Sequence, residues 1–152
     1  MHGRSDIRWA VRPLPDPPQS NLTLSDVLDN LAPTDDSYWS EDRASYLLSQ
    51  MSPKHREVAD AMIDGDRVTH GAVFRRVRKG VTRAELRTDG IAGCLRTPRG
   101  GSARQILFQA GQGGYAVRLL SGRECARLMG ADDYRLVGSL NRALFGFGDA
   151  VC

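Results

Sequence analysis

The stretch His70-Gly-Ala-Val-Phe-Arg-Arg-Val-Arg-Lys-Gly-Val-Thr-Arg-Ala-Glu-Leu-Arg-Thr88 decides the fold of this chain. In its first half Val73 and Val77 stand among arginines, and from Val81 onward short apolar and polar residues alternate. β-branched residues in such an alternation are typical of strands. The Lys79-Gly80 pair between the halves has the composition of a tight turn. The stretch therefore predicts a basic, two-stranded β-ribbon.

Three further strand-like runs follow the ribbon. Ile91–Leu95 and Gln105–Gln109 flank a polar stretch, and a glycine-rich turn at 111–114 leads into Tyr115–Leu120. Each run is short, apolar and bounded by turn residues, as strands are. We expect them to complete a small twisted β-unit over residues 67–117.

The chain before the ribbon divides into a linker and an acidic helical segment. Residues 1–22 contain four prolines within Arg12–Ser20, which lack amide donors and favour extended backbone, so we expect a linker there. Residues 23–66 predict three helices. The first is indicated by apolar positions at helical spacing (Leu24, Val27, Leu28 and Leu31), the second begins at Ser40, and the third has Ser52-Pro53 at its start and Gly65 at its end.

Residues 118–152 predict two C-terminal helices. Ser121 and Glu124 have the spacing of a capping box, and Gly130 is placed to end that helix. Leu140, Leu144 and Phe147 then indicate a last helix that runs to Gly148. The fold class is thus α+β: helices, a small twisted β-unit, and two further helices. We also expect exposed apolar surface on the last helix.

Positive charge is concentrated in the middle of the chain. Residues 1–66 hold six basic and twelve acidic groups, whereas residues 67–104 hold ten basic groups and two acidic ones. Nine of those ten are arginines, whose planar guanidinium suits bidentate contacts with phosphate or a guanine edge. This block predicts a surface that binds a polyanion; the alternative is a solvated, arginine-rich face.

The polar stretch inside this block is rich in hydrogen-bond donors. Gly100 and Gly101 allow close backbone approach, and around them lie Arg96, Thr97, Arg99, Ser102, Arg104 and Gln105. Such a loop suits a phosphate backbone and base edges, although a mobile glycine-rich surface loop has a similar composition.

This loop resembles a segment of the target recognition domain in one branch of the DNA (cytosine-5) methyltransferases. That segment is Leu-Arg-Thr-Pro-Arg-Gly-Gly-Ser-Ser-Arg-Gln, and Ala103 replaces its second serine. The resemblance implies that the loop residues from Arg96 to Gln105 named above bind double-stranded DNA.

A second stretch, Arg118-Leu-Leu-Ser-Gly-Arg-Glu-Cys-Ala-Arg-Leu-Met-Gly-Ala-Asp-Asp-Tyr-Arg135, is similar to the ninth motif of the same family. The resemblance implies a structural role in organising the recognition domain and its hinge for Arg118, Ser121, Arg123, Glu124 and Arg127. Ala131 stands where the family has Phe-Pro or Leu-Pro, so we expect a shorter turn after this helix.

The end of the sequence, Phe147-Gly-Asp-Ala-Val151, looks like the start of the family's tenth motif, which lines the S-adenosylmethionine pocket. The resemblance implies cofactor contacts from Gly148, Asp149, Ala150 and Val151. The family motif continues with Pro-Val and a helix, whereas Cys152 is the last residue here. We therefore expect S-adenosylmethionine to be bound mainly by a catalytic domain outside this sequence.

The residues that perform methyl transfer in this family are absent. The family adds a cysteine thiolate from a Pro-Cys motif to the flipped cytosine and uses the glutamate of a Glu-Asn-Val motif. None of the three cysteines here follows a proline, and Glu-Asn-Val does not occur. The resemblance thus implies the recognition portion of a methyltransferase, inactive without a catalytic partner chain. Alternatives are an inert remnant or stand-alone DNA-binding module, and an unrelated arginine-rich RNA-binding domain.

Other functional classes receive little support from the sequence. The three histidines show no metal-ligand spacing with the cysteines, so we expect no metal. No apolar run approaches a membrane span and the first six residues lack a signal-peptide pattern, which predicts a cytoplasmic protein. The resemblance to the methyltransferases further implies a bacterial, nucleoid-associated protein.

Overall fold

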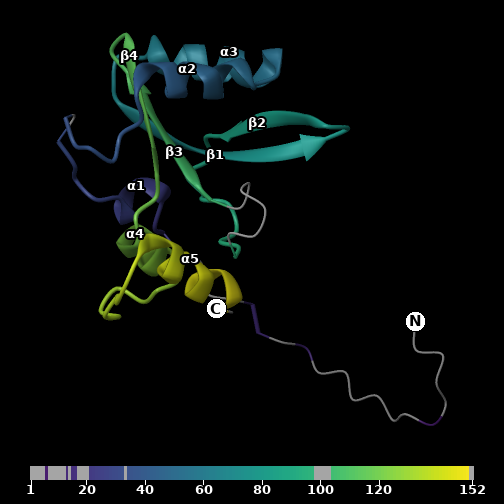
Figure 1. The fold of residues 1–152 in the computed structure, drawn as a ribbon, viewed down its shortest axis with the longest axis vertical. Helices are drawn as coiled ribbons and strands as arrows, with labels where there is room; N and C mark the ends of the chain where they lie inside the picture. The colour runs from purple at the N-terminus through teal and green to yellow at the C-terminus, as the bar shows by residue number, and fades with distance from the viewer. Residues whose placement is uncertain are drawn as a thin grey trace.

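A four-stranded antiparallel sheet forms the centre of the computed structural model, which describes residues 6, 13, 15–16, 21–32, 34–97 and 104–150 (Figure 1). The strands are β1 (Thr69–Arg78), β2 (Val81–Arg87), β3 (Ile106–Gly111) and β4 (Gly114–Leu119), in the spatial order β2-β1-β3-β4. Lys79 and Gly80 both have positive φ angles (50° and 76°), as a two-residue hairpin turn requires. The predicted basic ribbon is therefore confirmed as β1 and β2.

Helices cover both faces of the sheet. α2 (Glu41–Ser49) and α3 (Pro53–Ile63) lie on one face, and α1 (Leu24–Val27), α4 (Gly122–Leu128) and α5 (Leu140–Asp149) lie on the other (Figure 1). Neighbouring strand residues point to opposite faces, so Val73 joins the core beneath α2 and α3 while Ala72 joins the second core. The predicted α+β arrangement is confirmed.

Several helix boundaries agree with the sequence signals. Ser40 precedes α2, Ser52 precedes α3 with Pro53 at its first position, and the capping box at the start of α4 is formed by Ser121 and Glu124. α5 continues through Gly148 to Asp149, slightly beyond the predicted end. The predicted linker at 1–22 lies mostly outside the described residues.

Two expectations were wrong. Ile91–Leu95 is not a strand, because this segment lies beside the side chain of Gln105, which bonds to its backbone in place of a neighbouring strand. The first helix is only four residues long, because Leu28 is extended (φ −74°, ψ 147°) although its apolar spacing is helical. The early end of α1 allows the next residue, Asp29, to reach α4.

Candidate nucleic-acid interface

Five arginines gather on one side of the sheet, and we call them the arginine face: Arg76, Arg83, Arg87, Arg96 and Arg104. Arg76 and Arg83 are cross-strand partners in the ribbon, on the face that also carries Ala72 and therefore on the side of α1, α4 and α5. The segment from β2 to β3, which carries Arg96 and Arg104, returns along this same side, since its Gly90 carbonyl accepts from Leu24 of α1. The ribbon runs beside α3 and its tip projects beyond that helix, and the described part of the segment lies between the ribbon and α5 (Figure 1).

Two members of the arginine face are already paired with carboxylates. Arg76 Nε lies 3.4 Å from Glu85 and its guanidinium stands 4.8 Å from the centre of the Phe74 ring. Arg87 Nε donates to Asp89 at 2.8 Å; this hydrogen bond raises the pKa of Arg87 and lowers that of Asp89. Both pairs are largely solvent-exposed, so they reduce the local charge without adding much stability.

The other arginines keep their charge available. Arg83 and Arg96 are exposed, and among the described residues no carboxylate lies within ion-pairing distance of either. Arg104 is half-buried and donates to the Asn141 side chain of α5. Arg83 and Arg96 are therefore the best candidates for direct phosphate contacts.

The described part of the predicted DNA-binding loop is its stem. Gln105 is only 7% exposed; its Oε1 accepts from the Gly93 amide at 3.1 Å and its Nε2 donates to the Cys94 carbonyl at 3.0 Å. It thus fastens one side of the stem to the other instead of facing solvent. Thr97 is half-buried, with its backbone against α5. Arg99, Gly100, Gly101 and Ser102 lie outside the described residues.

A buried ion pair joins the last strand to α4. Arg118 and Glu124 are 2% and 0% exposed, and the guanidinium nitrogens Nη1 and Nη2 donate to the carboxylate oxygens at 2.7 and 2.5 Å. The carboxylate also accepts from the Ser121 and Asp29 amides at 2.6 and 2.8 Å. Because each oxygen of Glu124 accepts two hydrogen bonds, these bonds offset the free-energy cost of removing the carboxylate from water.

Asp29 extends this network to the rest of α4. Its carboxylate accepts from Ser121 Oγ at 2.8 Å and from Arg127 at 2.6 Å, and Arg127 also donates to the Val27 carbonyl at 3.0 Å. Four of the five predicted structural residues thus meet in one network with Asp29. The fifth, Arg123, donates to the Asp132 carbonyl and so holds the segment after α4.

The pKa of Asp29 is lowered from its ordinary value of 3.8. Burial alone would raise it, but the hydrogen bonds from Arg127 and Ser121, together with the charges of Arg127 and Arg118, outweigh that effect. Ionised Asp29 therefore stabilises the folded chain.

This shift predicts a loss of stability in acid. Because the pKa of Asp29 is lower in the folded state, its contribution is complete above about pH 4, the unfolded value, and disappears as the pH falls through the folded value. We expect Asp29→Asn to lower the free energy of urea unfolding by about 1–2 kcal/mol at pH 7 and by less at pH 3. Asp36→Asn, an equal change of charge at an exposed aspartate, is the control. An effect of Asp29→Asn that is the same at both pH values would contradict the assignment.

The residues predicted to contact the cofactor lie at the end of α5. A Cβ at Gly148 would overlap the backbone of Arg96 and Thr97, so the chain's own loop stem fills that space. Asp149 and Ala150 are exposed, and Val151 lies outside the described residues. The cofactor contacts that the resemblance implies for this segment stay a prediction.

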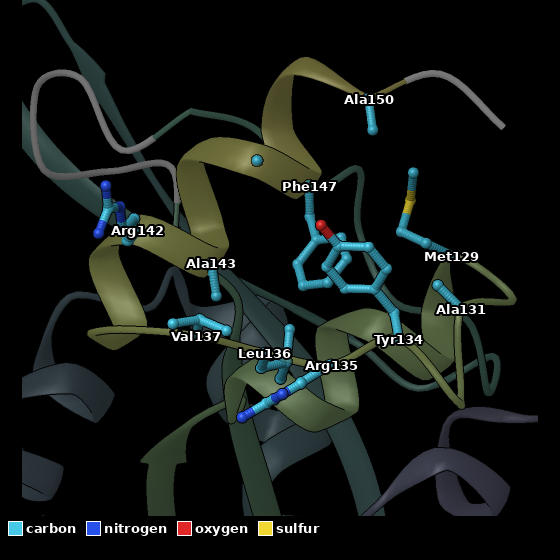
Figure 2. Close-up of a pocket in the computed structure, with 11 residues that line it drawn as sticks. Met129, Ala131, Tyr134, Arg135, Leu136, Val137, Arg142, Ala143, Phe147 and Ala150 are labelled. Carbon is cyan, nitrogen blue, oxygen red and sulfur yellow. The ribbon is translucent and has the colours of Figure 1, made fainter.

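An apolar groove lies between α5 and the segment after α4. It encloses about 670 Å³. Phe147 of α5 and Tyr134 of the facing segment point into the same space, and Arg135 and Arg142 contribute the charge (Figure 2). Val137, 71% exposed, and Tyr134, 65% exposed, leave apolar surface open to solvent here. The expected apolar surface beside the last helix is therefore present.

Two residues that sequence reasoning did not select are central to these sites. Asp29 connects α1 to α4, and Asn141 connects α5 to the loop stem. Asp29 was one of twelve acidic residues before the ribbon, and nothing in its local sequence distinguished it.

Within the part of the chain that the structure describes, no three histidine, cysteine or acidic side chains are grouped as a metal ion would need. None of the described helices is both long and apolar enough to cross a membrane. No family model, curated protein or solved structure matches this chain.

Proposed function

We propose that this chain is the DNA target-recognition portion of a DNA (cytosine-5) methyltransferase. The observation that carries the proposal is the arginine face. The stem of the loop that resembles the family's recognition segment lies on the side of the sheet where Arg83 and Arg96 have no carboxylate partner among the described residues. A basic ribbon beside a donor-rich loop provides phosphate contacts and base-reading groups together.

The ribbon and the loop have different tasks in this proposal. Arg83 and Arg96 bind phosphates and fix the orientation of the protein on the duplex, which gives salt-dependent affinity. The loop between the stem residues reads base edges, where arginine and polar side chains discriminate best. The buried Arg118–Glu124 pair holds α4 against β4.

Bond making is assigned to a partner chain that carries the catalytic domain. The sequence has no cysteine after a proline, so it supplies no nucleophile of the kind the family uses. S-adenosylmethionine would supply the methyl group from its site in that partner. Such an enzyme acts on DNA in the cytoplasm, at the bacterial nucleoid.

The groove beside α5 is the surface we assign to this partner. Its lining is mainly apolar and, among the residues that the structure describes, includes Arg135 and Arg142 but no acidic side chain. Charge complementarity therefore favours an apolar segment of the catalytic chain flanked by acidic residues.

Co-expression tests this proposal. The chain is produced with a neighbouring open reading frame that encodes Pro-Cys and Glu-Asn-Val motifs, and transfer of labelled methyl groups to duplex DNA is measured. We expect no activity from either chain alone and sequence-specific transfer from the complex. Val137→Asp in the groove, where this side chain is 71% exposed, should abolish complex formation, whereas Tyr46→Asp on the exposed side of α2 should not. Absence of both complex and activity would overturn the proposal.

A stand-alone DNA-binding module is the second candidate. The observation in its favour is that the sheet has a hydrophobic core on each face, so the recognition unit has its own packed interior. This candidate predicts salt-sensitive duplex binding with a log-log slope that corresponds to about 5 phosphates, without any gain from a partner. Preference for RNA over matched duplex DNA would instead indicate an RNA-binding domain. Absence of nucleic-acid binding even at low salt would indicate an inert remnant.

A further inference from the structure

α5 has two opposite sides with different contacts. At about 100° per residue, positions 141 and 148 fall on the same side of the helix. The groove-lining residues of α5 fall on the opposite side; they are Arg142, Ala143, Gly146 and Phe147. One helix thus faces the apolar groove on one side and the stem of the predicted DNA-binding loop on the other.

Gly148 lies against the stem where the chain enters the loop. The space where its Cβ would stand is occupied by the backbone of Arg96 and Thr97, which are not flexible side-chain atoms able to move aside. Only glycine allows this approach between the helix and the chain that enters the loop.

Asn141 contacts the other side of the stem, where the chain leaves the loop. Its Oδ1 accepts from a guanidinium nitrogen of Arg104. The next residue, Gln105, is buried and bonded to Gly93 and Cys94, so the base of the stem is also fixed to itself. Both ends of the loop are therefore held, one by Gly148 and the other by Asn141.

We propose that α5 positions the DNA-binding loop, with Gly148 and Asn141 as its positioning residues. This inference rests on the proposed function, because it concerns how the same loop is presented to DNA. It assigns Gly148 a contact with the loop rather than with a cofactor.

Two glycines on the same helix provide a matched test. Gly148→Ala forces the stem away from α5, whereas a Cβ at Gly146 meets nothing within 4 Å. We expect Gly148→Ala to weaken duplex binding by about tenfold, the equivalent of one charged hydrogen bond, and Gly146→Ala to leave it unchanged. Circular dichroism of both variants should match that of the original chain.

Limited trypsin digestion provides a readout that does not need DNA. The loop contains cleavage sites after Arg96, Arg99 and Arg104, and mass spectrometry can follow each site. Since cleavage requires local opening, Gly148→Ala should accelerate it at these sites and Gly146→Ala should not. Equal rates in the two variants would overturn the inference.

The digestion also separates this inference from the proposed function. If the original chain binds no DNA, the proposed function fails, while faster cleavage of Gly148→Ala still supports positioning by α5. Asn141→Ala provides a test that does not add bulk: it should accelerate cleavage after Arg104. Asn141→Asp, which keeps an acceptor for Arg104, should restore the slow rate. Cleavage after Arg104 that is as slow in Asn141→Ala as in the original chain would contradict the role of Asn141.

Discussion

Replacing Glu124 with alanine is expected to lower the free energy of unfolding by about 3–5 kcal/mol. The substitution leaves Arg118 charged and 2% exposed without its carboxylate partner. It also removes the acceptor for two backbone amides, those of Asp29 and Ser121. Unpaired buried charges and donors are among the most destabilising changes in proteins, so urea unfolding should show a large fall in the midpoint.

An exposed ion pair supplies the control for this measurement. Arg56 and Asp60 on α3 are four residues apart, and both side chains are 47% exposed. Asp60→Ala should cost less than about 1 kcal/mol, because solvent screens such pairs. If Glu124→Ala and Asp60→Ala had similar effects, the Arg118–Glu124 pair would not be the centre of this part of the fold.

A double substitution separates the two parts of the Glu124 effect. Arg118→Met with Glu124→Leu removes both charges and keeps the apolar volume, a change that is often neutral for a buried pair. Here we expect it to recover only part of the lost stability, because the Asp29 and Ser121 amides still lack an acceptor. Complete recovery would show that the unpaired charge alone was responsible.

Most of the fold could be predicted because its signals are local. Ser52-Pro53 at the start of α3 and the capping box of α4 act within one helical turn, and the Lys79-Gly80 turn sets the ribbon by its own backbone angles. Ile91–Leu95 was predicted wrongly because its composition suits a strand, while a distant side chain, that of Gln105, supplies its backbone bonds. A local pattern carries no information about such a partner.

The candidate site was less predictable than the fold for the same reason. The count of arginines in residues 67–104 correctly indicated a concentration of positive charge. Which of them keep their charge available depends on the register of β1 and β2, which sets Arg76 beside Glu85, and on the turn that brings Asp89 to Arg87. The contact between Gly148 and the loop stem joins residues about fifty positions apart, and no spacing rule connects them.

The double substitution Arg83→Ala with Arg96→Ala is expected to weaken duplex DNA binding by about a hundredfold, or tenfold for each lost charge-assisted contact. The two arginines lie on the ribbon and on the loop stem, on the same side of the sheet, and neither has a carboxylate partner among the described residues. Because each phosphate contact contributes about 0.9 to the slope of log affinity against log salt, the slope should decrease by about 1.8. Fluorescence anisotropy of a labelled duplex between low and moderate salt measures both quantities.

The control must remove the same net charge from the other face of the sheet. Lys54 and Arg56 are exposed on α3, which covers the opposite face, so Lys54→Ala with Arg56→Ala matches the loss of two positive charges. We expect this pair to change affinity by no more than a few-fold and to leave the salt slope nearly unchanged, since long-range attraction is screened beyond about 10 Å at 0.1 M salt. Equal losses from the two double variants would mean that net charge, rather than the arginine face, attracts the DNA. A loss confined to Arg83 and Arg96 would instead require that the duplex lie across the ribbon and the loop stem together, on the side of the sheet where α5 holds that stem.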